Sequence, residues 1–322
     1  MLAGEIEEIK NTGVNIRLNT KVNSLDELFE DGYDAIFLAI GAHQGAKLGV
    51  EGEDSPGVME GVSLLREINM GNKVRLGNRV AVIGGGNAAI DVSRNSLRLG
   101  ASEVTIIYRR TRAEMPASRE EVEEALHEGV KIEFLTAPTR IERKDDTLAL
   151  TCIRMELGAL DASGRRRPVP VKGSEFSPNF DTVIIAIGQV PKDSEQFGLP
   201  LGKGNTFQVD RDTLATTREG VFTGGDAVTG PATVIEAIAA GRQAAVSIDK
   251  YLGGSGVIDE TLAPPEEGVL SEIDEEEKPR VSIPSLPLCD RLNNFAEVEL
   301  CLGEEAAVEE AKRCLRCDLE ED

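Results

Sequence analysis

The sequence predicts an α/β protein built from two related units and followed by an acidic tail. Its strongest signal is a short apolar strand, 80–83, that runs directly into three glycines and then into a helical pattern from Asn87 to about Leu99. A second signal is an internal echo, because the strand-like run 34–42 recurs almost letter for letter at 181–189. Alternating strand and helix patterns with such an echo are typical of paired α/β units.

Length, charge and hydropathy limit the classes of function. The chain has 322 residues, enough for two domains with substantial cores. Its 35 Lys and Arg against 57 Asp and Glu give a net charge of −22, which argues against nucleic acid or an anionic membrane as partner. No apolar run approaches the ~20 residues of a membrane span, and no signal peptide opens the sequence. Five cysteines without regular spacing are typical of a reducing compartment, so we expect a cytoplasmic protein.

The glycine stretch after the first strand has the G-x-G-x-x-G/A pattern of a dinucleotide-binding turn. Gly84 permits the tight turn, Gly86 lets the backbone approach a pyrophosphate, and Ala89 is small enough for the helix to pack closely on the strand. The pyrophosphate would lie on the free N–H groups at the helix N-terminus. A glycine-rich turn in an ordinary α/β protein is the alternative. The predicted contact residues are Gly84, Gly85, Gly86, Asn87, Ala88 and Ala89.

The next strand, 104–108, indicates which dinucleotide is bound. An NAD site usually places Asp or Glu at this strand end, whereas here Arg109 and Arg110 follow the strand. A guanidinium binds phosphate through two parallel hydrogen bonds, so these arginines favour the 2′-phosphate of NADP. The alternative is a solvated basic turn that also includes Arg112.

Two further stretches indicate a second cofactor site. The run 34–42 ends in small residues, among them Ala39 and Gly41, where a cofactor can lie against the backbone. In the second stretch, Asp226 follows two glycines after a strand, and can reach a ribityl or ribose hydroxyl. The helix that begins near Thr233 would stabilise negative charge on a reduced flavin ring. A simple Gly-Asp turn is the alternative.

Local patterns predict the remaining elements. Alternation predicts a half-buried strand at 14–20, and Ser118 is expected to cap a helix that ends near His127. The region 138–178 is expected to form an antiparallel meander. Three further helices are expected at 4–12, 25–30 and 62–68.

The C-terminal region changes in composition. Residues 259–280 are rich in Pro and acidic residues and are expected to form a linker, with a solvated acidic run at 271–277. A last helix, about 304–315, ends in the pair Cys314 and Cys317. Such a C-x-x-C pair forms a dithiol, half of a metal or cluster site, or an inert pair, and these alternatives stay open on spacing alone.

The chain resembles the small subunit of glutamate synthase and its relatives, FAD- and NADPH-dependent oxidoreductases that pass electrons to iron–sulfur clusters. The resemblance covers roughly residues 5–255 and is carried by the motifs at 84–91, 108–117, 186–188 and 224–226. It implies a Rossmann-like NADPH domain, 76–190, inserted in a partial FAD-type α/β domain formed by 1–75 and 191–256, with residues 257–322 as an acidic linker and a C-terminal helix. It implies that Gly84, Gly86, Arg109 and Arg110 bind NADPH. It also implies cofactor contacts, mostly with FAD, at Ala39, Gly41, Gly188, Gly225, Asp226 and Thr233.

The same resemblance sets further expectations. Family members carry a cysteine-rich cluster segment and a first strand–G-x-G-x-x-G for FAD, and neither occurs after Met1. We therefore expect a fragment that lacks the FAD pyrophosphate site but retains NADPH binding. Hydride passes directly from nicotinamide to flavin in such enzymes, so no side chain is required as catalytic acid or base. Cys314 and Cys317 would belong to a partial cluster ligand set.

The expected redox partner is a large glutamate synthase-type subunit or a ferredoxin-like carrier, and a homo-oligomeric state is left open. The alternative function is a nucleotide-binding module that docks a redox partner without turnover of its own. The acidic tail and the C-x-x-C pair would then be the interaction element.

Overall fold

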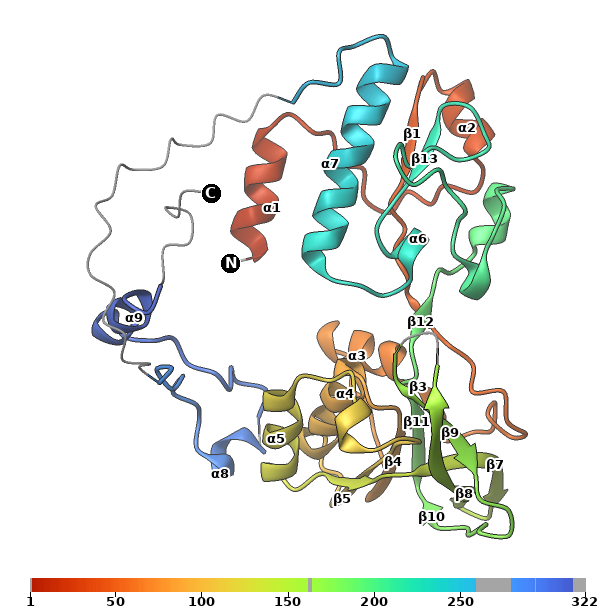
Figure 1. The fold of residues 1–322 in the computed structure, drawn as a ribbon, viewed down its shortest axis with the longest axis vertical. Coiled ribbons are helices and arrows are strands. Elements are labelled where there is room, and N and C mark those ends of the chain that lie inside the picture. Colours follow the sequence, from red (N-terminus) through yellow and green to blue (C-terminus); the bar gives the residue numbers. More distant parts are fainter. Residues whose placement is uncertain (1, 162–163, 259–278, 293, 315–322) are drawn as a thin grey trace. The chain divides into compact units, whose positions relative to one another are not determined.

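The computed structural model describes residues 2–161, 164–258, 279–292 and 294–314, and the chain divides into two units (Figure 1). Unit 1 consists of residues up to Ala42 together with Val190–Ile258. Unit 2 consists of His43–Gln189 together with the C-terminal residues. Each unit has its own buried core, and each is described separately below.

Unit 2 is organised around a parallel five-stranded sheet with the strand order β3-β11-β4-β5-β6. Apolar, largely β-branched runs form its central strands, which is typical of parallel strands buried on both faces. The bounds of the five strands are β3 Val58–Glu60, β4 Arg79–Ile83, β5 Glu103–Ile107, β6 Lys131–Glu133 and β11 Thr182–Ile185. The register aligns Ile83 of β4 with Ile107 of β5, so both strands end at the same edge of the sheet.

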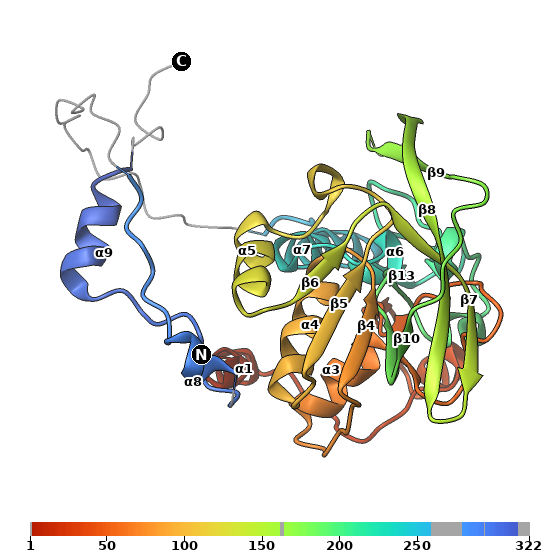
Figure 2. The ribbon, with the colours of Figure 1, turned by 90° about the horizontal axis from the view of Figure 1, so that it is seen from below.

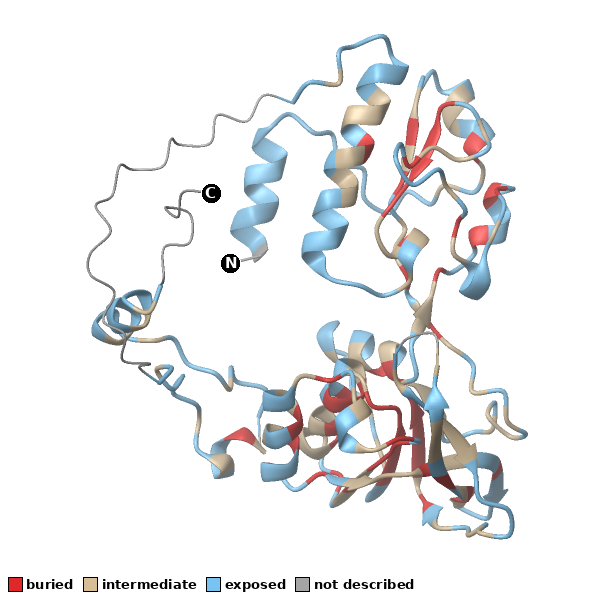
Figure 3. Ribbon diagram, viewed as in Figure 1, coloured by how far each residue is buried: buried red, intermediate tan, exposed pale blue. Residues whose placement is uncertain are grey.

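Three helices cover one face of this sheet. They are α3 Gly61–Asn69, α4 Asn87–Arg98 and α5 Arg119–His127. Leu64, Ile90 and Val122 of these helices pack on Val82 and Ile106 of the sheet in one buried core cluster. Figure 3 colours much of the central strands of this unit as buried. Ser118 caps α5 by accepting the Glu121 N–H, as predicted.

An antiparallel layer covers the other face of the sheet, as Figure 2 shows. Its strands are β7 Thr136–Lys144, β8 Thr147–Leu160, β9 Arg166–Pro170 and β10 Asn179–Phe180. Alternate residues of β8, Leu148, Leu150 and Cys152, pack against Ala81 and Val183 of the parallel sheet. The predicted antiparallel meander is thereby confirmed.

Unit 1 contains a parallel pair of strands, β1 Ile36–Leu38 and β13 Val221–Thr223. Phe197 and Phe207 pack with β1 and with Leu25 in its core. Its helices are α1 Leu2–Asn11, α2 Leu25–Glu30, α6 Asp226–Thr229 and α7 Val234–Tyr251.

Short elements complete the chain. A two-stranded pair joins β2 Gln44–Gly45 and β12 Gln189–Val190. Single turns of 3₁₀ helix lie at Arg112–Glu114, Ser194–Phe197 and Lys203–Asn205. The C-terminal region contributes α8 Leu288–Arg291 and α9 Glu304–Ala311. Among the described residues, no helix is both long and apolar enough to cross a membrane.

The structure differs from the sequence expectations in three places. Residues 14–20 form no strand, and Leu18 is 78% exposed, because no other strand pairs with this run within the described residues. Residues 43–75, which we expected in the first domain, lie in unit 2, since β3 pairs with β11 and Leu64 is fully buried in that core. The last helix ends at Ala311 rather than near residue 315. The acidic run 271–277 and Cys317 lie outside the described residues.

Candidate nucleotide-binding sites

The glycine turn of unit 2 is held tightly by the neighbouring strands. Gly84 has a φ of +149°, and a Cβ there would lie 2.1 Å from the carbonyl oxygen of Ala186. A Cβ on Gly85 would lie 2.5 Å from the ring of Tyr108, whose hydroxyl donates to the Glu114 carbonyl. Both positions therefore require glycine for packing reasons, independent of any ligand.

Gly86 is different, because the space beside it is open. It is the N-cap of α4 in extended backbone, with φ −94°, and the nearest atom to a Cβ there is a Pro116 carbon at 3.9 Å. No side chain caps this helix, and the N–H groups of Asn87 and Ala88 have no partner among the described residues. Ala89 is fully buried behind them. The tight turn predicted at Gly84 and the close packing predicted at Ala89 are present, and the cofactor contacts expected at this turn stay a prediction.

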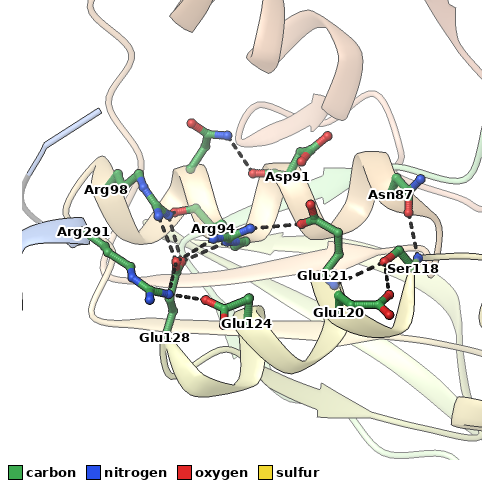
Figure 4. Close-up of polar contacts among 11 residues, drawn as sticks. Asn87, Asp91, Arg94, Arg98, Ser118, Glu120, Glu121, Glu124, Glu128 and Arg291 are labelled. Carbon is green, nitrogen blue, oxygen red and sulfur yellow. Dashed lines mark hydrogen bonds and ion pairs between the residues drawn. The ribbon is translucent and has the colours of Figure 1, made fainter. Parts of the chain in front are cut away.

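The loop after β5 is fixed beside the turn by backbone contacts. The Ala117 N–H donates to the Gly85 carbonyl at 3.2 Å. The Asn87 side-chain oxygen accepts the Ser118 N–H at 3.0 Å, as Figure 4 shows. Asn87 thus has a structural contact of its own, in addition to its place at the start of α4. Ala88 follows it in the first turn of that helix.

The two arginines predicted to bind phosphate have different environments. Arg109 is exposed at the carboxyl end of β5 and makes no hydrogen bond or ion pair with another described residue. Arg110 is buried, and its guanidinium binds Asp161 at 2.6 Å and the carbonyl of Arg166 at 2.8 Å. Arg112 pairs with Glu123. The expectation for Arg110 thus meets a competing role, because Asp161 and the Arg166 carbonyl already accept hydrogen bonds from its Nη2 and Nε.

A second site is a pocket of about 240 Å³ in unit 1. Five of the predicted residues line it, which are Ala39, Gly41, Gly225, Asp226 and Thr233. Sequence reasoning missed its apolar walls, formed by Phe37, Gly224, Ala232, Val234 and Ala237. The signal for Phe37 and Gly224 was present, since they lie in the same strand–turn segments as the predicted residues.

Polar groups at this pocket are already oriented. Asp226 Oδ1 accepts the Ala232 N–H at 3.1 Å, which fixes the carboxylate. Thr233 caps α7 by accepting the Glu236 N–H, and the Glu236 carboxylate in turn accepts both the N–H and the hydroxyl of Thr233. Two hydrogen bonds from Thr233 lower the pKa of Glu236, and the bond from its backbone N–H has a larger effect than the bond from its hydroxyl. The Thr233 donors are therefore taken by Glu236 rather than open to a ligand.

Gly188 follows β11, with φ +133°, and its carbonyl accepts the Ala46 N–H.

Cys314 is exposed, whereas Cys152 is buried, and burial raises the pKa of its thiol to about 12. Within the described ranges, no group of three or more His, Cys, Asp or Glu side chains is placed to hold a metal.

The strand–glycine turn–helix of unit 2, with a parallel sheet and an arginine at the neighbouring strand end, defines a Rossmann-type dinucleotide-binding protein. Comparison with known proteins gives the family. The model of the pyridine nucleotide-disulphide oxidoreductases matches residues 2–241, and the chain belongs to this family.

Relatives extend the match beyond that region. The chain is 46% identical to the NADP(+)-dependent formate dehydrogenase subunit beta of Moorella thermoacetica, over 98% of this chain and 47% of the relative. It is 40% identical to the NADPH-Fe(3+) oxidoreductase subunit beta of Geobacter sulfurreducens, over 98% and 53%. It is 37% identical to the glutamate synthase [NADPH] small chain of Escherichia coli, over 74% and 55%. The chain thus spans about half the length of these relatives.

Solved structures confirm the fold. Mycobacterium tuberculosis FprA in complex with NADPH is 22% identical, with a TM-score of 0.61 over 73% of this chain and 68% of FprA. Lactococcus lactis thioredoxin reductase is 20% identical, with a TM-score of 0.52 over 68% of this chain and 66% of the reductase. The predicted mixed α/β, Rossmann-like class is confirmed, as is the resemblance to glutamate synthase small subunits.

Proposed function

We propose that this chain binds NADPH on unit 2 and contributes part of a flavin site on unit 1, so that electrons pass from NADPH through the flavin to an iron–sulfur centre or a partner subunit. The observation that carries the proposal is the glycine turn, open at Gly86, with Arg109 exposed at the end of the adjacent parallel strand. This arrangement offers backbone N–H groups to a pyrophosphate and an unpaired guanidinium to a 2′-phosphate.

Arg109 is the residue we assign to the 2′-phosphate, and Arg110 has a supporting role. The guanidinium of Arg110 holds Asp161 and the backbone of Arg166, and its own backbone carbonyl accepts the Leu135 N–H. Arg110 thereby fixes the chain directly after Arg109. We assign the pyrophosphate to the N–H groups of Gly86, Asn87 and Ala88, because the Ala89 N–H already donates to the Gly86 carbonyl at 2.9 Å.

The pocket of unit 1 has the chemistry of a flavin site. Phe37, Val234 and Ala237 give it an apolar lining, and Val234, which is 76% exposed, leaves apolar surface for a ligand to cover. Asp226 is oriented by Ala232, which leaves its second carboxylate oxygen for a ligand hydroxyl. A bound flavin would supply the hydride chemistry, and the side chains here bind and orient it without acting as acid or base.

Partners are inferred from the relatives, whose names describe beta subunits and small chains of oxidoreductases. We propose a partner subunit or a ferredoxin-like carrier as the electron acceptor. Cys314 and Cys317 are proposed to contribute to a cluster that other cysteines complete.

The test is anaerobic mixing of the chain with FAD and NADPH, followed through the flavin absorbance and paired with calorimetric titration of NADPH and NADH. Flavin reduction that depends on Asp226 and prefers NADPH supports the proposal. Nucleotide binding without flavin reduction would favour a docking module for a redox partner instead. Absence of nucleotide binding would refute both readings.

A further inference from the structure

A buried carboxylate joins two helices of unit 2. The side chain of Glu128, at the end of α5, is fully buried, with 0% of its surface exposed. Arg94 of α4 donates to its two oxygens at 3.1 and 2.8 Å, and Arg98 does so at 2.9 and 2.9 Å (Figure 4). Burial by itself would raise the pKa of Glu128, but the hydrogen bonds from Arg98 and Arg94 outweigh burial and lower it. Glu128 therefore carries a negative charge at neutral pH.

A third guanidinium reaches this cluster from the C-terminal region. Arg291 of α8 is 5% exposed and forms an ion pair with Glu124, and its Nη1 lies 3.9 Å from Glu128 Oε1. Its remaining donors are held by its own segment, since Nε donates to the Leu286 carbonyl at 2.5 Å and Nη2 donates to Ser285 Oγ at 2.7 Å. The segment thus presents Arg291 in a fixed orientation.

The segment 279–314 has an organisation of its own. The Leu286 N–H donates to the Val298 carbonyl at 2.9 Å, and the Leu300 N–H donates to the Pro284 carbonyl at 2.7 Å. Cys289, Cys301 and Cys314 are all exposed on this segment. We call it the C-terminal arm.

We propose that Arg291 acts as a latch: it binds a socket formed by Glu124 and Glu128 and thereby docks the C-terminal arm on unit 2. Unit 2 then carries the exposed cysteines of the arm. The charges explain why the latch holds. Three carboxylates, those of Glu121, Glu124 and Glu128, face three guanidiniums when Arg291 is in place. Release of the arm takes the Arg291 ion pair from Glu124, whereas Glu128 keeps its four hydrogen bonds from Arg94 and Arg98, so the Arg291–Glu124 pair is the main contact of the latch.

The carboxylate of Glu128 also binds α4, the helix that follows the glycine turn. Arg94 and Arg98 belong to α4, the helix whose first turn begins at Gly86. Given the proposed function, the cysteines of the arm therefore accompany the NADPH-binding unit rather than the flavin-binding one. The latch itself rests on the ion cluster and does not depend on which nucleotide is bound.

Hydrogen exchange on the full chain, without nucleotide, tests the latch. In Arg291→Gln, we expect the amides of the arm between 281 and 300 to exchange about tenfold faster or more, because the lost ion pair releases the arm. Glu124→Gln removes the same contact from the other side and should give the same result. Glu297→Gln is the control, because Glu297 lies on the arm, is exposed and makes no hydrogen bond or ion pair with another described residue, so it should leave exchange unchanged.

The double variant Arg291→Gln/Glu124→Gln should exchange no faster than the faster single variant, since both changes break one contact. Unchanged exchange in both single variants, or additive acceleration in the double variant, would overturn the latch. Amides of β4 report on the whole unit. If Arg291→Gln unfolds unit 2, the exchange measured for Glu124→Gln tests the latch instead, because the Glu124 side chain is 37% exposed and its substitution disturbs the unit less.

Discussion

Two glycines of one turn are expected to respond in opposite ways to substitution. Gly84 and Gly86 are two residues apart in the same motif, yet the structure packs one and leaves the other open. A Cβ at Gly84 would lie 2.1 Å from a backbone oxygen, whereas a Cβ at Gly86 has no atom nearer than 3.9 Å. Gly84→Ala should therefore affect folding, and Gly86→Val should affect binding.

The magnitudes follow from these distances. Gly84→Ala places a side chain at φ +149° against the Ala186 carbonyl, and left-handed strain together with overpacking should cost about 2–5 kcal/mol. That cost lowers the Tm by about 4–20 °C. Gly86→Val has extended backbone and free space, so its cost should stay below about 1 kcal/mol. If it displaces a pyrophosphate from two N–H groups, at about 1.5–3 kcal/mol each, the Kd for NADPH should rise about a hundredfold or more.

Thermal unfolding and calorimetric titration of both variants measure these effects. The expected result is a folded Gly86→Val protein that has lost NADPH affinity, beside a destabilised Gly84→Ala protein. Undiminished NADPH binding by Gly86→Val would refute the assignment of the pyrophosphate to this turn. An undisturbed Tm in Gly84→Ala would refute the packing argument.

Four further predictions concern individual side chains or, in the last case, a pair of cysteines. Arg109→Ala should weaken NADPH binding by about 1.5–3 kcal/mol and leave NADH binding nearly unchanged in calorimetry, and equal losses would contradict the 2′-phosphate assignment. Arg110→Ala should instead lower the Tm, because it removes the hydrogen bonds of the guanidinium to Asp161 and to the Arg166 carbonyl, and a loss of NADPH selectivity at unchanged Tm would argue for direct phosphate contact. Cys152 should resist alkylation at pH 8 until the protein unfolds, and rapid labelling of the native protein would contradict this. Burial raises the pKa of its thiol from 9.0 to about 12. The contribution of the buried thiol to stability should therefore be fully present below pH 9 and be lost as the pH rises toward 12. Cys314→Ser/Cys317→Ser should leave NADPH binding intact, and loss of NADPH-dependent disulfide reduction in this variant would favour a dithiol role instead.

The sequence alone was sufficient for the central α/β unit and its turn. The strand–glycine–helix signal is local, because backbone sterics and period decide it within about twenty residues, and β4, α4 and the glycine turn between them follow from it. The same holds for the capped start of α7 at Thr233. Such features need no knowledge of distant partners.

Tertiary structure decided what depends on pairing. The alternation at 14–20 predicted a strand, but a strand needs a neighbour to bind its backbone groups, and the structure gives this run none within the described residues. Residues 43–75 belong to unit 2 because β3 pairs with β11, more than a hundred residues away. Arg109 and Arg110 are adjacent and chemically identical, and only the fold gives one to Asp161 and leaves the other exposed. Arg291 binds Glu124, which lies 167 positions earlier in the chain, and no sequence pattern around either residue predicts this pair.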